Sequence, residues 1–357
     1  MEGARSQRGR GAAVKFVRAP LPGNTLLRPR LVDALASVDT PLTLVVAGPG
    51  CGKTVAVGQW LEAEASTVAW VTLDGGDDAP PQFWASISES LVRATGSLGR
   101  EALRMLDDEQ DTARVVAGLL AELPRTGPPL IIVLDDLHVL RSMPLMAELG
   151  LFIERLPPPV RVVATSRVDP QLPLGRWRVS QRMVEIRQRD LQFTNEEAAA
   201  LFAASGLPGV AAADIEFLAE RTEGWAAGLQ LAVLSLRDRA DPHEYIRSSL
   251  MGDQGIVDYL LGEVLASLSD EDRGLVLDLS ILDTFDVDLA RAVTGSPDAG
   301  QRVRSLEARN LLLLPADARG ERFRFHQLLR EFLVAELRWR SPGRVAELHI
   351  AAADHLE

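Results

Sequence analysis

The chain has 357 residues, more than a single domain usually holds, so we expect two or three domains. Its 46% hydrophobic and 25% charged residues are typical of a globular protein and exclude a disordered one, while a net charge of −12 argues against a general nucleic-acid or anionic-membrane surface. One cysteine, Cys51, excludes an internal disulfide; with neither a membrane-spanning run nor a signal peptide, a cytoplasmic protein with no membrane partner is expected.

The first 24 residues are predicted to form a flexible tail. Met1–Arg18 is rich in Arg, Gly and Ala and shows no periodicity. A nucleic-acid-binding arm is the alternative for this stretch. Leu26–Leu35 then predicts a short helix ahead of the first strand. Its Arg28 and Arg30 could approach the adenine or the phosphates of a nucleotide, and a solvated helix face is an equal alternative.

A phosphate-binding loop is predicted directly after an apolar strand at Leu42–Ala47. Strand, glycine-rich loop and helix follow one another here, which is the context that a P-loop requires, whereas a plain glycine-rich turn is the alternative. Glycines let backbone N–H groups point at a phosphate, and the helix N-terminus adds partial positive charge. Lys53 would reach the β- and γ-phosphates, and the Thr54 hydroxyl would bind Mg²⁺. The predicted nucleotide-binding residues of the loop are Gly48, Pro49, Gly50, Cys51, Gly52, Lys53, Thr54 and Val55.

Two carboxylates end a further apolar strand at Leu130–Leu134, which follows a second apolar strand at Thr67–Leu73. In a P-loop protein such a strand end lies beside the phosphates and holds Mg²⁺, so Asp135 is the predicted metal residue together with Thr54. Asp136 could polarise the attacking water or could simply cap the following helix. An Asp at this second position, where many hydrolytic relatives place Glu, suggests slow turnover.

Arg167 follows another buried strand, Val160–Thr165. Ligands collect at the carboxyl ends of parallel strands, so Arg167 is expected on the same edge as Lys53 and Asp135, where it could sense a γ-phosphate. Lys53, Asp136 and Arg167 are therefore the candidate catalytic residues. Because strands and helices alternate, residues 25–190 are predicted to form an α/β P-loop NTPase domain, with a parallel sheet in a three-layer arrangement.

From residue 191 onward the chain is predicted to be almost entirely helical. Thr194 and Glu197 form a capping box at the start of a helical domain, residues 191–250. A winged-helix domain is expected at residues 251–341, with a hairpin of Leu311–Leu314 and Arg322–Phe325. Its would-be recognition helix carries three arginines, for which an internal role is expected rather than DNA binding: Arg302, Arg304 and Arg309. Residues 342–357 are expected to begin a further helical region of a longer protein.

Seven motifs occur in an order that resembles a known family. They are AGPGCGKT, LDGGDD, LIIVLDDLHVL, VVATSR, LQFTNEEAAALF, EGWAAGLQLAVLSL and FRFHQLLREFL. Together they resemble the amino-terminal half of the MalT-like, LuxR-type large ATP-binding transcription regulators of the STAND class. The resemblance implies a nucleotide-binding domain, a helical domain and a winged-helix domain clamped over the nucleotide. In the family an inducer-sensing helical-repeat domain and a DNA-reading helix-turn-helix follow, and neither is present here.

The resemblance also implies roles for particular residues. It assigns the P-loop role to Gly48–Thr54, the Mg²⁺ role to Asp135 and the sensor role to Arg167. His326 stands where a STAND winged helix places a histidine against the β-phosphate, with simple packing as the alternative. Trp225 follows Gly224 in the segment facing the adenine, where relatives often carry a proline. The similarity of Arg30 to the family's arginine before the P-loop is suggestive.

The predicted function is an ATP- and ADP-binding regulatory switch of a transcription activator. ADP would hold the domains closed, ATP with Mg²⁺ would open them, and weak ATPase activity would reset the switch. Expected partners are the nucleotide, other copies of the chain in the ATP state, an inducer bound through the missing sensor domain, and DNA only through the missing helix-turn-helix. The alternatives are a dedicated ATPase and a STAND sensor with a non-transcriptional effector.

Overall fold

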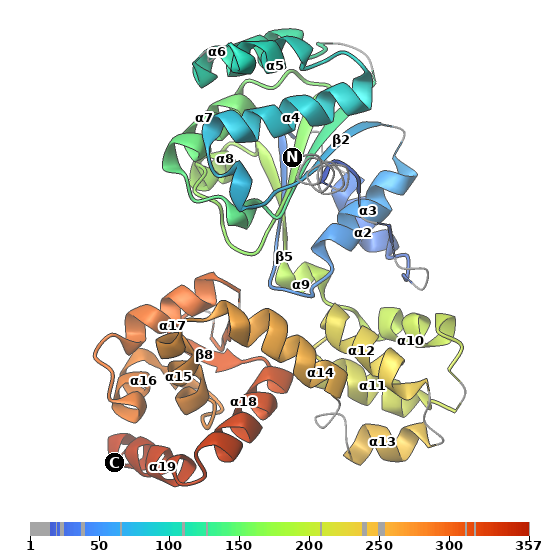
Figure 1. Cartoon of the computed structure of the whole chain (residues 1–357). Helices are drawn as coiled ribbons and strands as arrows, with labels where there is room; N and C mark the ends of the chain where they lie inside the picture. The colour runs from blue at the N-terminus through green and yellow to red at the C-terminus, as the bar shows by residue number, and fades with distance from the viewer. Residues whose placement is uncertain are drawn as a thin grey trace, which may run out of the picture. The chain divides into compact units, whose positions relative to one another are not determined.

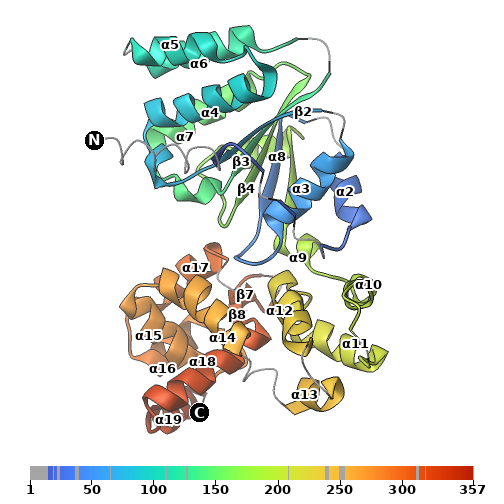
Figure 2. The same cartoon turned by 45° about the vertical axis from the view of Figure 1, so that its right-hand side comes forward.

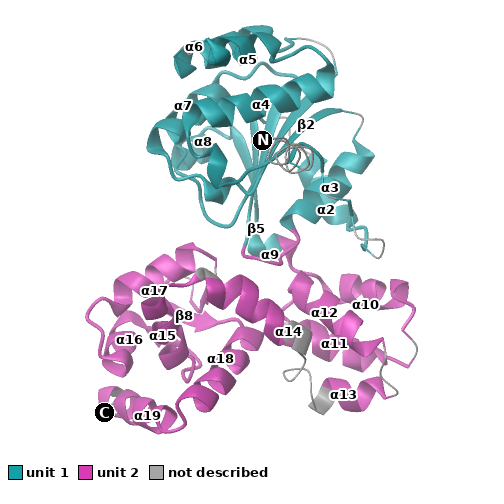
Figure 3. Ribbon diagram, viewed as in Figure 1, with its two compact units in different colours: residues 1–47, 53–190 teal, residues 48–52, 191–357 magenta. Residues whose placement is uncertain are grey.

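The computed structural model describes residues 15–356 except 19, 22–24, 37–39, 65, 109–110, 126–127, 208, 238–240, 249–253, 311–312 and 318. Most of the predicted tail therefore lies outside the described residues. The chain divides into two units, shown in Figure 3: unit 1 holds residues 1–47 and 53–190, and unit 2 holds residues 48–52 and 191–357. The short segment Gly48–Gly52, taken from the predicted phosphate loop, thus clusters with unit 2, although both of its flanks belong to unit 1.

Unit 1 is built on a five-stranded parallel sheet with the strand order β2-β3-β4-β1-β5. The three central strands are buried along their whole length, as expected for apolar runs covered on both faces. The strands are β1 (Leu42–Val46), β2 (Thr67–Thr72), β3 (Leu130–Asp135), β4 (Val160–Ser166) and β5 (Met183–Arg187).

Helices cover both faces of this sheet (Figures 1 and 2). In both views α3 and α2 lie on one side, while α4 and α7 lie on the other with α5 and α6 outside them. The helices are α2 (Pro29–Ala36), α3 (Lys53–Ala63), α4 (Pro80–Thr95), α5 (Arg100–Asp107), α6 (Thr112–Glu122), α7 (Met143–Glu154), α8 (Leu174–Val179) and α9 (Gln188–Leu191). Trp84 makes edge contacts with Phe83 and Phe152 in the core between α4 and α7. The predicted parallel three-layer fold is confirmed.

The first part of unit 2 is helical. It contains α10 (Asn195–Ala204), α11 (Ala212–Arg221), α12 (Ala226–Leu236), α13 (Pro242–Ser248) and α14 (Gln254–Tyr259). The predicted capping box is confirmed, because the Thr194 side chain accepts from the Glu197 N–H and the Glu197 carboxylate accepts from the Thr194 N–H. A π-helical turn at Leu260–Val264 continues α14 toward the next region.

The remainder of unit 2 is a winged helix with one further helix. Its elements are α15 (Asp270–Leu279), β6 (Phe285–Asp286), α16 (Val287–Thr294), α17 (Ala299–Ala308), β7 (Leu313–Pro315), β8 (Arg322–Phe325), α18 (Gln327–Arg340) and α19 (Arg344–Leu356). The strands form an antiparallel sheet in the order β6-β8-β7, in which Leu313 is opposite Phe325. The predicted hairpin is therefore present, and residues 311–312 of its first strand lie outside the described residues.

Two of the three arginines at α17, Arg302 and Arg309, make contacts within the winged helix itself. Arg302 pairs with Asp298 on its own helix and with Asp272 on α15, at 2.7 and 2.9 Å. Arg309 also approaches Asp272, at 3.7 Å. These contacts neutralise positive charge that a DNA-reading helix would present to phosphates, and they support the internal role expected for Arg302 and Arg309. Arg304 is exposed, and its internal role remains a prediction.

Within the described part of the chain, no helix combines the length and the apolar character needed to cross a membrane.

Candidate functional site

Polar side chains from the ends of β3 and β4 and from the first turn of α3 meet at the carboxyl edge of the sheet of unit 1. The Thr54 hydroxyl, in the first turn of α3, donates to Asp135 Oδ1 at 3.0 Å. The Thr165 hydroxyl on β4 donates to the same carboxylate at 2.6 Å. Lys53 Nζ donates to the carbonyl of Ala47 at 2.9 Å, at the end of β1. The parallel sheet thus brings together residues that are 81 positions apart in the sequence.

Asp135 has the surroundings of a cation ligand. Its side chain is buried, and burial raises the pKa of the carboxyl group, while the hydrogen bonds from Thr165 and Thr54 work in the opposite direction. A hydroxyl and a carboxylate side by side are the oxygen donors that Mg²⁺ takes in phosphate sites, where waters and phosphate oxygens complete the coordination. The residues present therefore fit Mg²⁺. Among the described residues no group of three His, Cys, Asp or Glu side chains forms a metal site made by protein alone.

Asp136 is held in an unusual backbone conformation. Its φ of 63° lies in the left-handed region, which non-glycine residues rarely adopt. Its N–H donates to the Thr165 hydroxyl at 3.0 Å, so the strand end of β4 fixes this turn. Asp136 precedes a short 3-10 turn, Leu137–Val139, but its side chain makes no capping hydrogen bond. The capping alternative for Asp136 is therefore wrong.

His138 is a candidate site residue for which the sequence analysis assigned no role. Its Nδ1 lies 3.7 Å from Asp136 Oδ1 and is buried without a hydrogen-bond partner. Burial lowers the pKa of His138 to about 4; Asp136 opposes this shift, and the positive charges of Arg167 and Lys53 reinforce it. His138 is therefore neutral at physiological pH and lies within electrostatic reach of three predicted site residues. The motif LDDLHVL contains it, two residues after Asp136.

The residues on both sides of Arg167 are held by hydrogen bonds. On one side the Ser166 hydroxyl donates to the carbonyl of Val168 at 2.5 Å and accepts from the Val168 N–H at 3.2 Å. On the other side Asp169 accepts from the guanidinium of Arg187, the last residue of β5, at 2.5 Å. The backbone that carries the predicted sensor arginine is therefore anchored to the sheet.

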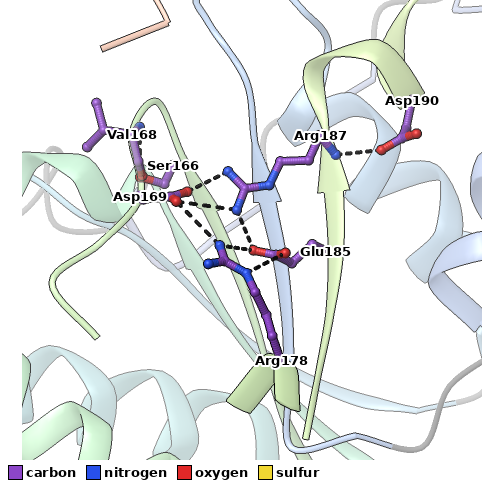
Figure 4. A network of polar contacts seen from close by, with 7 residues as sticks. All are labelled: Ser166, Val168, Asp169, Arg178, Glu185, Arg187 and Asp190. Carbon is purple, nitrogen blue, oxygen red and sulfur yellow. Dashed lines mark hydrogen bonds and ion pairs between the residues drawn. The ribbon is translucent and has the colours of Figure 1, made fainter. Parts of the chain in front are cut away.

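Figure 4 shows the network that surrounds Asp169. Arg178 of α8 contacts Asp169 at 3.4 Å and binds both oxygens of Glu185 at 2.8 and 2.9 Å. Glu185 also pairs with Arg187, whose own N–H donates to the Asp190 carboxylate at 2.8 Å. These side chains are partly exposed, so each pair is weak alone, and the network as a whole holds the loop after β4 against β5.

Arg30 lies on α2 and contacts the last residue of unit 1. Its guanidinium donates to the carbonyl of Asp190 at 2.5 Å. Its predicted contact with the nucleotide remains a prediction.

The segment Gly48–Gly52 is held by the helical part of unit 2. The indole N–H of Trp225 donates to the carbonyl of Pro49 at 3.1 Å, and the N–H of Ala227 donates to the carbonyl of Gly50 at 2.9 Å. Gly50 and Gly52 have φ values of 68° and 84°, which glycine adopts without strain. Cys51 is buried, with Sγ 3.8 Å from the Pro49 carbonyl.

His326 lies between β8 and α18 of the winged helix. Its side chain is 1% exposed, and its Nε2 hydrogen-bonds to the carbonyl of Thr222 at 2.8 Å. Because a carbonyl only accepts, Nε2 carries a proton and the neutral ring presents a lone pair at Nδ1. Nδ1 is buried and has no hydrogen-bond partner. Burial lowers the pKa of His326, against the pull of Glu223, so the ring is neutral when nothing else contacts it.

Glu223 joins the helical part of unit 2 to the winged helix. Both of its carboxylate oxygens accept from Arg324 at 2.7 Å, and one of them accepts from the N–H of Gln327 at 3.0 Å. Burial opposes ionisation of Glu223, but the hydrogen bonds from Arg324 lower its pKa overall. Arg221 and Glu331 add a second ion pair nearby at 2.5 Å. The winged helix that carries His326 is thus fastened to the turn before Trp225.

Two known families match parts of the chain. Residues 21–163 match the AAA ATPase domain, and residues 261–345 match the MalT winged helix domain. A serine/threonine-protein kinase, PknK of Mycobacterium tuberculosis strain H37Rv, is 31% identical over 347 residues, which are 96% of this chain and 31% of that protein. The HTH-type transcriptional regulator MalT of Serratia proteamaculans is 32% identical over 336 residues, which are 93% of this chain and 37% of that protein. The chain therefore spans about a third of these relatives.

The fold also matches a solved structure. A Walker-type ATPase of Pyrococcus abyssi aligns with a TM-score of 0.59 at 15% identity, over 87% of this chain and 96% of that one. At this identity the likeness concerns the fold alone. Together the matches confirm the resemblance predicted from the seven motifs and support an ATPase-containing regulatory module that binds nucleotide.

Proposed function

Because the chain is MalT-like and joins an AAA ATPase domain to a MalT winged helix, we propose that it is the nucleotide-operated switch of a transcription regulator. ADP favours a closed form, ATP with Mg²⁺ favours an open, self-associating form, and slow hydrolysis returns the protein to the closed form. ATP shifts this equilibrium only as far as its affinities for the two forms differ.

Unit 1 supports nucleotide binding through its charges. Lys53 is the candidate for the β- and γ-phosphates, and its ammonium already donates to the carbonyl of Ala47 at the mouth of the loop. Thr54 and Asp135 would hold Mg²⁺, which when bound neutralises the phosphates. Asp136 and Arg167 would orient water and contact the γ-phosphate. Slow turnover is expected, because the second carboxylate of the strand end is an Asp held in a left-handed turn.

The observation that carries the switch is the buried, unpartnered Nδ1 of His326. A buried polar atom without a partner is costly, and a phosphate oxygen would satisfy Nδ1 once that nitrogen carries a proton. His326 belongs to unit 2, which also contains Gly48–Gly52 of the phosphate loop. A neutral ring offers no proton at Nδ1 while Nε2–H is bound to Thr222, so His326 must take up one proton to donate to a phosphate. We therefore expect ADP binding to be accompanied by proton uptake.

Two substitutions test the proposal. Lys53→Ala should weaken ADP and ATP binding by roughly 100-fold, since an ammonium–phosphate contact is charge-assisted. Lys15→Ala is the matched control: Lys15 already pairs with Asp77 at 2.6 Å, so its loss should leave nucleotide affinity unchanged. Calorimetric titration measures both. Equal affinity of wild type and Lys53→Ala would overturn nucleotide binding at this loop.

The closed state is tested separately at His326. His326→Ala should speed ADP release by about tenfold or more, because one charge-assisted hydrogen bond is lost, while ATP-bound protein is less affected. Stopped-flow displacement of a fluorescent ADP analogue gives the rate. Unchanged release and affinity for ADP would show that the winged helix does not close on the nucleotide.

The second candidate function is a nucleotide-operated switch that controls an output other than transcription. The relative named as a serine/threonine-protein kinase matches 96% of this chain, so the same module accompanies two kinds of output among its relatives. A dedicated ATPase is the remaining alternative. Steady-state turnover well above roughly one per second would favour that enzyme over a switch.

A further inference from the structure

The start of α12 contacts the phosphate loop from its carbonyl side. Trp225 is the N-cap residue of this helix, and Ala227 lies in its first turn. The indole N–H of Trp225 and the backbone N–H of Ala227 donate to two consecutive loop carbonyls, those of Pro49 and Gly50. The first N–H groups of a helix have no partner within the helix, so Ala227 makes this bond without giving up a helical one.

These two bonds determine where the next amides of the loop point. In a trans peptide the C=O and the following N–H lie in one plane and point in opposite directions. A donor on the Pro49 carbonyl therefore orients the N–H of Gly50, and a donor on the Gly50 carbonyl orients the N–H of Cys51. Both N–H groups are turned away from α12, and hydrogen bonding at the carbonyl also polarises each amide toward stronger donation.

The fit between loop and helix is close at Gly50. A Cβ at this position would lie 2.5 Å from Tyr259 Oη and 2.7 Å from Ala227 Cβ, so no larger residue fits without movement. At Gly52 the same test gives 3.7 Å to Ala226 Cβ, which is ordinary contact. Gly52 is thus needed for its φ, whereas Gly50 is needed for its φ and for the approach of α12.

We propose that Trp225 is a positioning residue for the phosphate loop, an inference that rests on nucleotide binding at Gly48–Thr54. Trp225 and Ala227 hold the Gly50 and Cys51 amides ready for the oxygens of a nucleoside diphosphate. Preorganised donors bind an anion more tightly than mobile ones, because no ordering cost remains. The helical part of unit 2 therefore completes the phosphate-binding loop.

The environment of Trp225 links the loop to the winged helix within unit 2. Its side chain is 3% exposed, and its ring packs edge to face on Tyr259, with 5.4 Å between centroids, and on His326, with 5.9 Å. The indole thus contacts both the loop and the histidine that we propose to close on the nucleotide. Coupling of this kind is reciprocal, so bound nucleotide must also stabilise the contacts of Trp225.

Trp225→Phe tests the inference, because it keeps an aromatic ring and deletes the N–H. ADP affinity measured by calorimetry should fall by about tenfold, the loss expected for one buried hydrogen bond and the loop order it maintains. Trp177→Phe is the matched control: Trp177 is as buried, and its indole N–H donates to Glu154 at 3.0 Å and not to the loop, so ADP affinity should stay within about twofold. ADP affinity in Trp225→Phe equal to that in Trp177→Phe would overturn the proposal.

Hydrogen exchange of the wild-type protein gives a second readout that does not depend on a folded variant. ADP should slow exchange in the peptide 222–230 together with the peptide 47–56, and leave the peptide 171–180 unchanged. If ADP protects only 47–56, Trp225 and Ala227 do not support the bound loop, and the proposal is wrong. Lys53→Ala distinguishes failure of nucleotide binding from failure of the positioning role. If the Lys53→Ala protein binds ADP like wild type, nucleotide binding at the loop is wrong. If Lys53→Ala abolishes ADP binding but Trp225→Phe binds ADP normally, only the positioning role of Trp225 is wrong.

Discussion

The candidate residues of the two units differ in their chemistry. The candidate residues of unit 1 are charged: Lys53 begins α3, Asp135 ends β3 and Arg167 directly follows β4. Those of unit 2 are nearly neutral and buried: a tryptophan, a histidine and backbone N–H groups. Unit 1 is suited to balance the charge of a polyphosphate and its cation. Unit 2 is suited to respond to whether the loop is occupied, since its contacts are directional hydrogen bonds that a small shift breaks.

The largest effect that would sharpen this comparison is expected at Asp135. Asp135→Asn removes the carboxylate that would share Mg²⁺ with Thr54, so the dependence of ATP affinity on Mg²⁺ should fall by roughly 100-fold or vanish. Titration of ATP with and without Mg²⁺ measures it. Asp74→Asn, at an exposed carboxylate after β2, is the control and should keep the Mg²⁺ dependence. An Asp135→Asn protein that still responds fully to Mg²⁺ would place the cation elsewhere.

An intermediate effect is expected at the junction inside unit 2. Glu223→Gln weakens the paired hydrogen bonds to Arg324, so the free energy of unfolding of unit 2 should fall by about 1–2 kcal/mol, allowing for the partial exposure of Arg324. Asp288→Asn breaks an exposed pair on α16 and should cost less than about 0.5 kcal/mol. Urea denaturation followed by circular dichroism compares them. Equal losses in the two variants would mean that Glu223 is not a junction residue.

The smallest effect is a pH dependence that both units should share. The pKa of His138 is lowered to about 4 and that of His326 is also lowered, so the unfolded chain binds more protons than the folded one below the unfolded value of about 6.5. The stability that the two neutral, buried histidines contribute is complete above pH 6.5, and it is lost as the pH falls toward their pKa values in the folded protein. Between pH 7 and pH 5 we expect a loss of about 1 kcal/mol through His138 after solvent screening, and a loss in the same direction through His326.

Histidine substitutions assign this slope to the units. His138→Gln should flatten the pH dependence of unit 1 unfolding, and His326→Gln that of unit 2. The wild-type protein provides the reference slope for both units. Stability that rises on acidification between pH 7 and pH 5 would contradict the neutral, buried state of both rings.

The sequence predicted the elements whose signal is local. The apolar run before two aspartates, the glycine-rich loop and the Thr194–Glu197 capping box each carry their structure within a few residues, and all are present as expected. The sequence did not predict the loop contacts of Trp225 or the environment of His138. Those depend on tertiary packing: nothing near Trp225 in the chain shows that its N–H reaches Pro49, 176 residues away. The left-handed turn at Asp136 was missed for the same reason, because Thr165 on β4 fixes it.

Because Gly48–Gly52 clusters with unit 2 while Ala47 and Lys53 cluster with unit 1, cutting the chain between Asp190 and Leu191 would not yield two self-sufficient pieces. The amino-terminal piece would retain its lysine, hydroxyl and carboxylate, but water would replace the donors on the carbonyls of Pro49 and Gly50. When the ATPase region is expressed by itself, we expect a folded sheet with a less ordered phosphate loop. Its nucleotide affinity should be weaker than that of the longer protein.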